Sequence, residues 1–212
     1  MIMNWGLMSR ELNQWLSQPA TPEASPLLDA LAPIASATGP SRPQLGVPAP
    51  EHVDQLPTFS QARGADLWWL GAHGGAGESS LAALVPEWPA ASHGWPIVPG
   101  VTISRVVVVA RSNVRGLRAA QHAATQWASG LVPYAQVLGL VIVADTPGRL
   151  PRPLREFSRL VSGGFPRTWT VPWVEAWRLG EPPTLPTAPR EARRLIDDLS
   201  ALLRPGALGT VN

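Results

Sequence analysis

The sequence predicts an α/β fold: a three-layer sandwich with a mainly parallel sheet. Short apolar runs alternate with segments of helical periodicity along residues 63–203. The runs over 106–109 and 136–144 are continuous and rich in valine, which is typical of parallel strands buried on both faces. A regular strand–helix alternation places helices on both sides of such a sheet.

Composition divides the chain into three parts. Residues 1–62 are rich in proline, which predicts a flexible arm with a short amphipathic helix at its N-terminal end. Residues 63–180 hold the predicted strands and most of the helices. Residues 181–212 begin as a proline-rich connector and continue into a helix over 191–203, which we expect to pack on the domain.

The elements of the domain follow in a simple order. A strand over 67–70 leads through a glycine-rich loop into a helix over 79–84, and a proline-containing loop covers 85–100. The strand over 106–109 precedes a helix that Ser112 or Asn113 can cap and Gly130 can end. After the strand over 136–144 come a helix over 154–161 and an alternating strand over 167–171, which we place nearer an edge of the sheet.

The stretch after the first strand carries the clearest functional signal. A strand, a glycine loop and a helix in this order can present backbone N–H groups to a phosphate. The residues of this candidate phosphate loop are His73, Gly74, Gly75, Ala76, Gly77, Glu78, Ser79 and Ser80.

This loop resembles the deviant P-loop of the ParA/MinD family, whose pattern is G-K-G-G-x-G-K-[ST]. Gly74, Gly75, Gly77 and Ser79 match the pattern, whereas Ala72 replaces the first glycine and His73 and Glu78 replace the two lysines. The later elements are similar to the C-terminal half of these proteins over residues 66–180, without a clear Walker B strand. The resemblance implies a truncated fold like that of the P-loop NTPases. The chain is also similar to an uncharacterised group of actinobacterial proteins with the same altered loop.

The change to Glu78 bears directly on nucleotide binding. A lysine contributes about 4 kcal/mol of attraction to a phosphate about 4 Å away, whereas an ionised glutamate repels it by a similar amount. Micromolar binding amounts to only about 8 kcal/mol, so we expect Glu78 to abolish most ATP binding in the usual position. The chain contains no lysine to substitute. Arg111 and Arg149 follow predicted strands, and we expect one of them to pair with Glu78 or to hold an anion.

Other chemistry has less support in the sequence. The chain has no cysteine, its four histidines lack metal-ligand spacing, and no serine lies in a nucleophile elbow, so we predict neither a catalytic residue nor a metal site. Asp145 is interpreted as a turn residue beside the ligand edge. The resemblance places Trp173, Glu175 and Trp177 under a nucleotide base, and a protein interface is the alternative for them.

Partners are predicted mainly from the arm. A helical stripe is formed by Trp5, Met8, Leu12 and Trp15 and suits docking on another protein or packing on the chain's own domain. A second copy of the chain is a further candidate partner. DNA is another, which exposed arginines at 152, 155 and 159 would contact. No apolar run is long enough to span a membrane and no signal peptide is evident, which predicts a cytoplasmic protein.

The function expected from these features is that of a non-enzymatic scaffold or adaptor that binds a protein partner and needs no cofactor. A nucleotide-binding switch is the alternative, in which arginines replace the lysine and ATP or GTP binds weakly with magnesium. A DNA-binding accessory protein is a second alternative, which depends only on the arginine faces. Its place in a plasmid or conjugative element is implied by the family resemblance.

Overall fold

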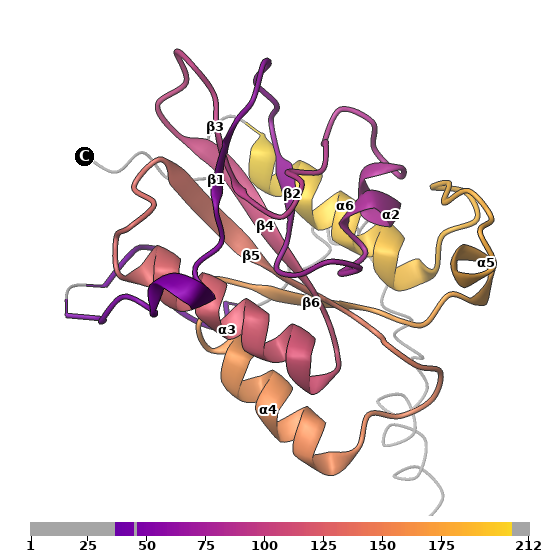
Figure 1. The fold of residues 1–212 in the computed structure, drawn as a ribbon. Helices are drawn as coiled ribbons and strands as arrows, with labels where there is room; N and C mark the ends of the chain where they lie inside the picture. The colour runs from indigo at the N-terminus through magenta and orange to yellow at the C-terminus, as the bar shows by residue number, and fades with distance from the viewer. Residues whose placement is uncertain (1–36, 45, 205–212) are drawn as a thin grey trace, which may run out of the picture. The chain divides into compact units, whose positions relative to one another are not determined.

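A four-stranded parallel sheet forms the centre of the computed structural model, which describes residues 37–44 and 46–204. Its strands are β2 (Trp68–Gly71), β4 (Ser104–Arg111), β5 (Ala135–Val143) and β6 (Thr168–Val171), in the order β2-β4-β5-β6 (Figure 1). The predicted α/β class is confirmed, and the strand predicted near an edge, β6, lies at one.

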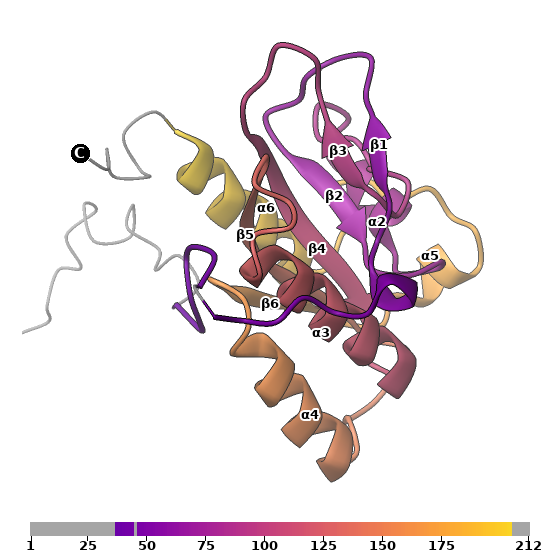
Figure 2. The same ribbon diagram turned by 60° about the vertical axis from the view of Figure 1, so that its left-hand side comes forward.

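A second, two-stranded sheet pairs β1 (Thr58–Ser60) in parallel with β3 (Trp95–Ile97), and it lies beyond β2 (Figure 2). The sequence pattern predicts neither strand and places both segments in the arm or a loop, because strands of three residues are too short to show periodicity. Just before β3, Ala90 forms a parallel bridge with Trp69 of β2. The segment that follows α2 therefore returns to the outer edge of β2.

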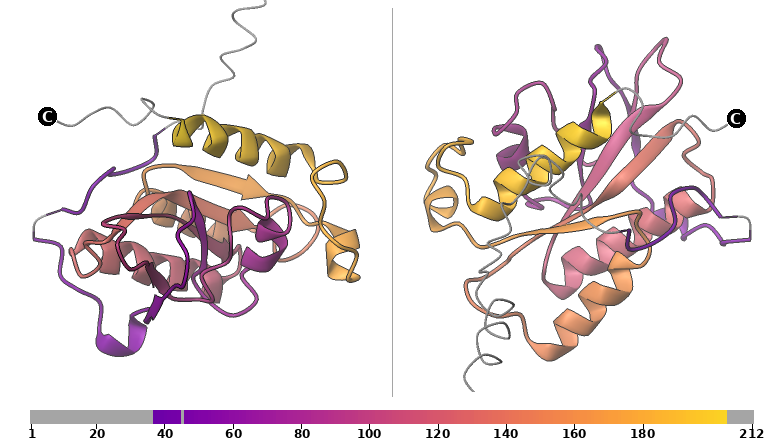
Figure 3. Two further views of the ribbon diagram at one scale, coloured as in Figure 1. Left: turned by 90° about the horizontal axis from the view of Figure 1, so that it is seen from above. Right: turned by 180° about the vertical axis from the view of Figure 1, so that it is seen from behind.

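Helices cover both faces of the central sheet (Figure 3). One face packs against α3 (Val114–Ala128) and α4 (Arg152–Ser162), and the other against α6 (Arg190–Leu203) and the short α2 (Glu78–Ala82). Successive valines of β4 alternate between the two cores: Val106 and Val108 contact the first, Val107 and Val109 the second. This alternation explains why a continuous valine run is needed there, since each side of the strand is buried.

Helix α3 follows its sequence pattern closely. The side chain of Asn113 caps it by accepting a hydrogen bond of 2.8 Å from the backbone N–H of Gly116. The predicted apolar face is buried and consists of Leu117, Ala120, Ala124 and Trp127. The arginines predicted to face solvent on α3 and α4 are exposed, at positions 115, 118, 152, 155 and 159.

Ordered structure begins well before Arg63, where we had placed the start of the domain. The N–H of Thr38 donates to Pro166 O at 3.0 Å, and the N–H of Gln44 donates to Ala128 O at 2.9 Å. This segment runs past α3 into the short helix η1 (His52–Asp54) and β1 (Figure 2). The described part of the predicted arm is thus hydrogen-bonded to the domain, while the stripe from Trp5 to Trp15 lies outside the described residues.

The chain leaves β2 and β4 toward opposite faces of the sheet. After β2 it passes through α2 to residues 89–91 at the outer edge, and after β4 it passes through α3 to β5. In open α/β sheets such a reversal, called a topological switch point, forms a crevice at the carboxyl ends of the two strands, where ligands bind.

None of the helices over 37–44 and 46–204 has the length and apolar content required to cross a bilayer.

Candidate functional site

The glycine loop after β2 forms a tight turn that only its glycines permit. Gly75 and Gly77 adopt φ angles of 77° and 104°, in the left-handed region where a side chain is strained. Gly77 is also the N-cap of α2. Between them Ala76 is buried, whereas Gly74 and Ser79 are exposed. The loop predicted from sequence therefore exists at the predicted place, at the carboxyl end of β2.

Glu78 points into the protein. Its side chain accepts a hydrogen bond from the N–H of Gly71, and its Oε1 lies 3.1 Å from Nδ1 of His93. The residue is only 4% exposed. We had expected Arg111 or Arg149 as its cation, and this is wrong: the segment that returns beside β2 brings His93 to Glu78.

The sequence at both ends of this contact is suited to it. A Cβ atom on Gly71 would lie 2.6 Å from the Glu78 carboxylate, so a larger residue at this position would displace that carboxylate from its contact. His93 and Ser92 have φ angles of 61° and 55°, which is uncommon for residues other than glycine. The backbone therefore bends sharply where His93 reaches Glu78.

Arg111, at the end of β4, connects the loops that follow three strands. Its Nε–H donates to Gly75 O at 3.0 Å and its Nη1 donates to Ala144 O at 2.9 Å. Its backbone N–H donates to Nε2 of His73 at 3.1 Å. Because Nε2 accepts, the hydrogen of a neutral His73 ring is on Nδ1, which lies 2.9 Å from Gly74 O. These contacts hold the glycine loop and Arg111 together across the crevice between the carboxyl ends of β2 and β4.

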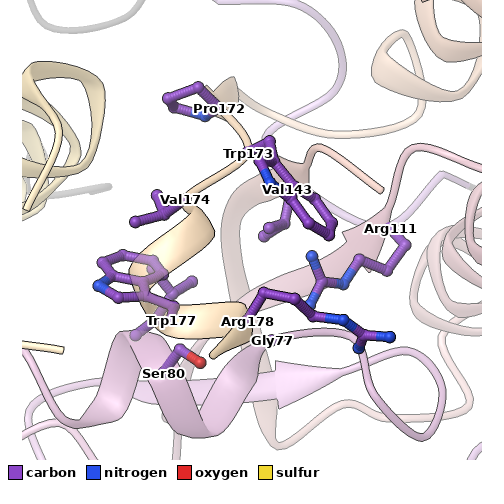
Figure 4. Close-up of a pocket in the computed structure, with 10 residues that line it drawn as sticks. Gly77, Ser80, Arg111, Val143, Pro172, Trp173, Val174, Trp177 and Arg178 are labelled. Carbon is purple, nitrogen blue, oxygen red and sulfur yellow. The ribbon is translucent and has the colours of Figure 1, made fainter. Parts of the chain in front are cut away.

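A cavity of about 120 Å³ opens beside Arg111 at this edge of the sheet (Figure 4). Helix α2 and the turn before it supply one wall, the ends of β4 and β5 a second, and the segment after β6 a third. The lining residues are Gly77, Ser80, Leu81, Arg111, Val143, Pro172, Trp173, Val174, Trp177 and Arg178. Arg178, which no sequence pattern marks as a site residue, belongs to the one-turn helix α5 (Glu175–Arg178).

The cavity is electropositive. Arg111 and Arg178 lie on the same side of it, with Trp177 opposite (Figure 4). Burial is the largest influence on Arg111 and lowers its pKa, Asp145 raises it, and Arg178 lowers it. Within the described ranges, no carboxylate lies at ion-pair distance from either guanidinium. Two neighbouring cations without a paired anion favour an anionic ligand.

The remaining candidate residues are divided between this cavity and its surroundings. Trp173 and Trp177 line it half-buried, and the indole N–H of Trp173 donates to the carboxylate of Glu175. Asp145 donates its backbone N–H to Ser112 Oγ at 3.0 Å and does not line the cavity. Arg149 is exposed after β5 and is not a lining residue either. Across the described part of the chain, no cluster of His, Asp and Glu side chains could hold a metal ion.

The fold and this cavity define an α/β protein with an arginine-lined crevice at the carboxyl edge of its parallel sheet. Residues 65–194, well over half of the chain, match the family of unknown function DUF6668, and the chain belongs to this family. No curated protein and no solved structure matches the chain.

Proposed function

We propose that the protein is a nucleotide-binding switch on a fold like that of the P-loop NTPases, in which arginines replace the P-loop lysine. The observation that carries this proposal is the pair Arg111 and Arg178, which line one cavity without a carboxylate at ion-pair distance among the described residues. The cavity lies beside the glycine loop at the ligand edge of the sheet.

The position of Glu78 removes the main objection to nucleotide binding. The expected repulsion requires an ionised carboxylate that faces the phosphates. Glu78 instead bonds Gly71 and contacts His93, at the outer edge of β2. Arg111 belongs to β4, on the other side of β2. A ligand beside Arg111 therefore faces two cations and is not directed at this carboxylate.

The indoles of Trp173 and Trp177 supply the second feature that a nucleotide needs. Stacking of a base on an aromatic side chain is worth about 1–3 kcal/mol and suits any base. The hydrogen bond from Trp173 to Glu175 fixes one of the two rings. The mixture of guanidinium and indole groups thus suits a ligand with an anionic end and an aromatic end.

Hydrolysis is not part of this proposal. In the part of the chain that the structure describes, no carboxylate and no histidine lines the cavity to position a water molecule against a phosphate. The protein would therefore bind the nucleotide and respond to it without turnover.

Titration calorimetry with ATP and GTP tests the proposal. Wild-type protein should bind one of them with a micromolar Kd, and Arg111→Gln should weaken this binding at least about tenfold. Arg149→Gln is the matched control, because it removes an arginine after the neighbouring strand that does not line the cavity. Absence of binding at millimolar nucleotide, or equal weakening by both variants, would refute the proposal.

The two other roles expected from the sequence stay predictions. The scaffold role depends on Trp5, Met8, Leu12 and Trp15, which lie outside the described residues. The DNA-binding role depends on the arginines of α4, where Arg152 donates to Glu156 at 2.8 Å and is partly neutralised.

A further inference from the structure

We infer that the ligand class of this cavity is a phosphomonoester, in the form of a nucleoside monophosphate whose phosphate binds between Arg111 and Arg178. This inference rests on the proposed function and makes it more specific. It departs from the usual arrangement of a phosphate loop, in which a chain of phosphates lies along the loop itself.

Arg111 is prepared for such a phosphate. A guanidinium has five N–H donors in a planar fork. Two of the Arg111 nitrogens already donate to Gly75 O and Ala144 O, which fixes the plane of the group. The donors that remain, together with those of the more exposed Arg178, can form the paired hydrogen bonds that phosphate oxygens accept. Because Arg111 is already oriented, little conformational entropy is lost on binding.

The size of the cavity restricts what it can enclose. Its volume of about 120 Å³ is well below the roughly 300–1,000 Å³ of pockets that enclose a whole drug-sized ligand. It can hold the phosphate of a ligand while the remainder lies against the half-buried Trp173 and Trp177 at its rim. The cavity therefore selects for one compact anionic group.

Further phosphates would gain little. Among the described residues that line the cavity, Arg111 and Arg178 are the only ones with charged side chains. Beyond Arg111 toward the loop lies the carbonyl oxygen of Gly75, which repels an anion. The second and third phosphates of ATP would also lack a carboxylate to share a magnesium ion with, because none lines the cavity. Affinity should then depend on the first phosphate and not on the length of the chain.

Calorimetry on the full chain with AMP, ATP, adenosine and inorganic phosphate tests this inference, each with magnesium and with EDTA. AMP and ATP should bind with Kd values within about threefold of each other, unchanged by EDTA, and adenosine should bind at least about tenfold more weakly. Arg178→Gln should weaken AMP about tenfold or more and leave adenosine unchanged, whereas Arg149→Gln should alter neither. Circular dichroism of each variant shows whether it is folded.

The outcomes separate this inference from the proposed function. ATP with magnesium that binds tenfold more tightly than AMP would overturn the monophosphate inference and leave the nucleotide switch intact. Inorganic phosphate that binds as tightly as AMP would show that the indoles contribute nothing to binding. That result would overturn both the monophosphate inference and the proposed nucleotide-binding function. No binding of any nucleotide would overturn both as well.

Discussion

Glu78 and His93 pair at the outer edge of β2, with 3.1 Å between Oε1 of the glutamate and Nδ1 of the histidine. The Glu78 carboxylate therefore faces the protein interior, where it accepts a hydrogen bond from the N–H of Gly71 and contacts a segment that follows it in the chain. Through the hydrogen bond from Gly71, this side chain links the start of α2 to the end of β2.

Substitutions of Glu78 should lower stability in a defined order. Glu78→Gln keeps an oxygen that accepts from the N–H of Gly71, so we expect a small loss. Glu78→Ala leaves that buried N–H without an acceptor, which costs about 1–3 kcal/mol. Glu78→Lys places a buried cation against an N–H donor and should cost about 3–5 kcal/mol.

Urea unfolding of the three Glu78 variants measures this order. A Glu78→Lys protein as stable as the wild type would contradict the buried geometry. It would instead revive the expectation that the lysine completes a conventional phosphate loop.

Gly116→Ala should destabilise the protein although it improves helix propensity. Alanine is better than glycine in a helix by about 1 kcal/mol. Here its Cβ would lie 2.3 Å from Arg111 O and 2.9 Å from His73 Nε2, and such overpacking costs about 1–3 kcal/mol. We expect a lower melting temperature and weaker nucleotide binding, because the backbone of Arg111 must shift.

Gly74→Ala is the control for this experiment. Gly74 lies in the same site, but its added Cβ would meet nothing within 4 Å. Its melting temperature should match the wild type within error. Equal destabilisation by both alanine variants would show that the close contact at Gly116 is not the cause.

Trp169→Phe should destabilise the second core. The indole N–H of Trp169 donates to Asp198 Oδ2 at 2.8 Å, and both residues are buried. A hydrogen bond to a charged group contributes about 1.5–3 kcal/mol, and phenylalanine cannot form it. Chemical denaturation should show a loss of this size.

Trp173→Phe is the matched control, because it removes an exposed hydrogen bond from an indole N–H to the carboxylate of Glu175. Trp173 is only half-buried, so we expect a smaller loss of stability there than at Trp169. A loss at Trp173 as large as that at Trp169 would contradict the assignment of the stabilising effect to burial.

Gln126→Ala should weaken the attachment of the segment around Leu56 to helix α3. The buried amide of Gln126 accepts from the N–H of Leu56 and from Nε1 of Trp95, each at 2.9 Å, and donates to Leu56 O at 3.0 Å. Without it, two donors lose their acceptor, and we expect a loss of about 2–4 kcal/mol. Limited proteolysis should show faster cleavage between residues 46 and 57. Gln121→Ala, which changes an exposed glutamine on the same helix, should leave cleavage unchanged.

The parts of the fold that the sequence predicted are those with a repeating physical signal. The valines of β4 and the apolar face of α3 are set by burial, which determines residue type position by position. The N–H groups of Thr38 and Gln44 instead bond to backbone carbonyls. Any residue except proline can make such a bond, so the proline-rich segment gave no sign that it is ordered there.

The candidate site divides in the same way. Its glycines were recognisable because Gly75 and Gly77 occupy left-handed conformations, and Arg111 because it follows a strand. His93 and Arg178 were not, since each reaches the site only through tertiary folding. His93 arrives on the segment that returns beside β2, and Arg178 on a single helical turn in a region rich in proline. Neither setting has a local pattern that indicates which way the side chain points.

The hydrogen bonds of the segment over residues 38–56 also constrain when this segment can fold during synthesis. Thr38 Oγ1 donates to Phe165 O, a partner 127 residues later, and Leu56 awaits Gln126, 70 residues later. At a translation rate of about 5–20 residues per second, Thr38 is made roughly 6–25 s before its partner exists. This segment therefore leaves the ribosome early, but it can dock only after α3 and the turn before β6 have also emerged. Proline has no N–H to donate to a strand ladder, so the prolines between residues 40 and 57 disfavour pairing with other strands during that interval.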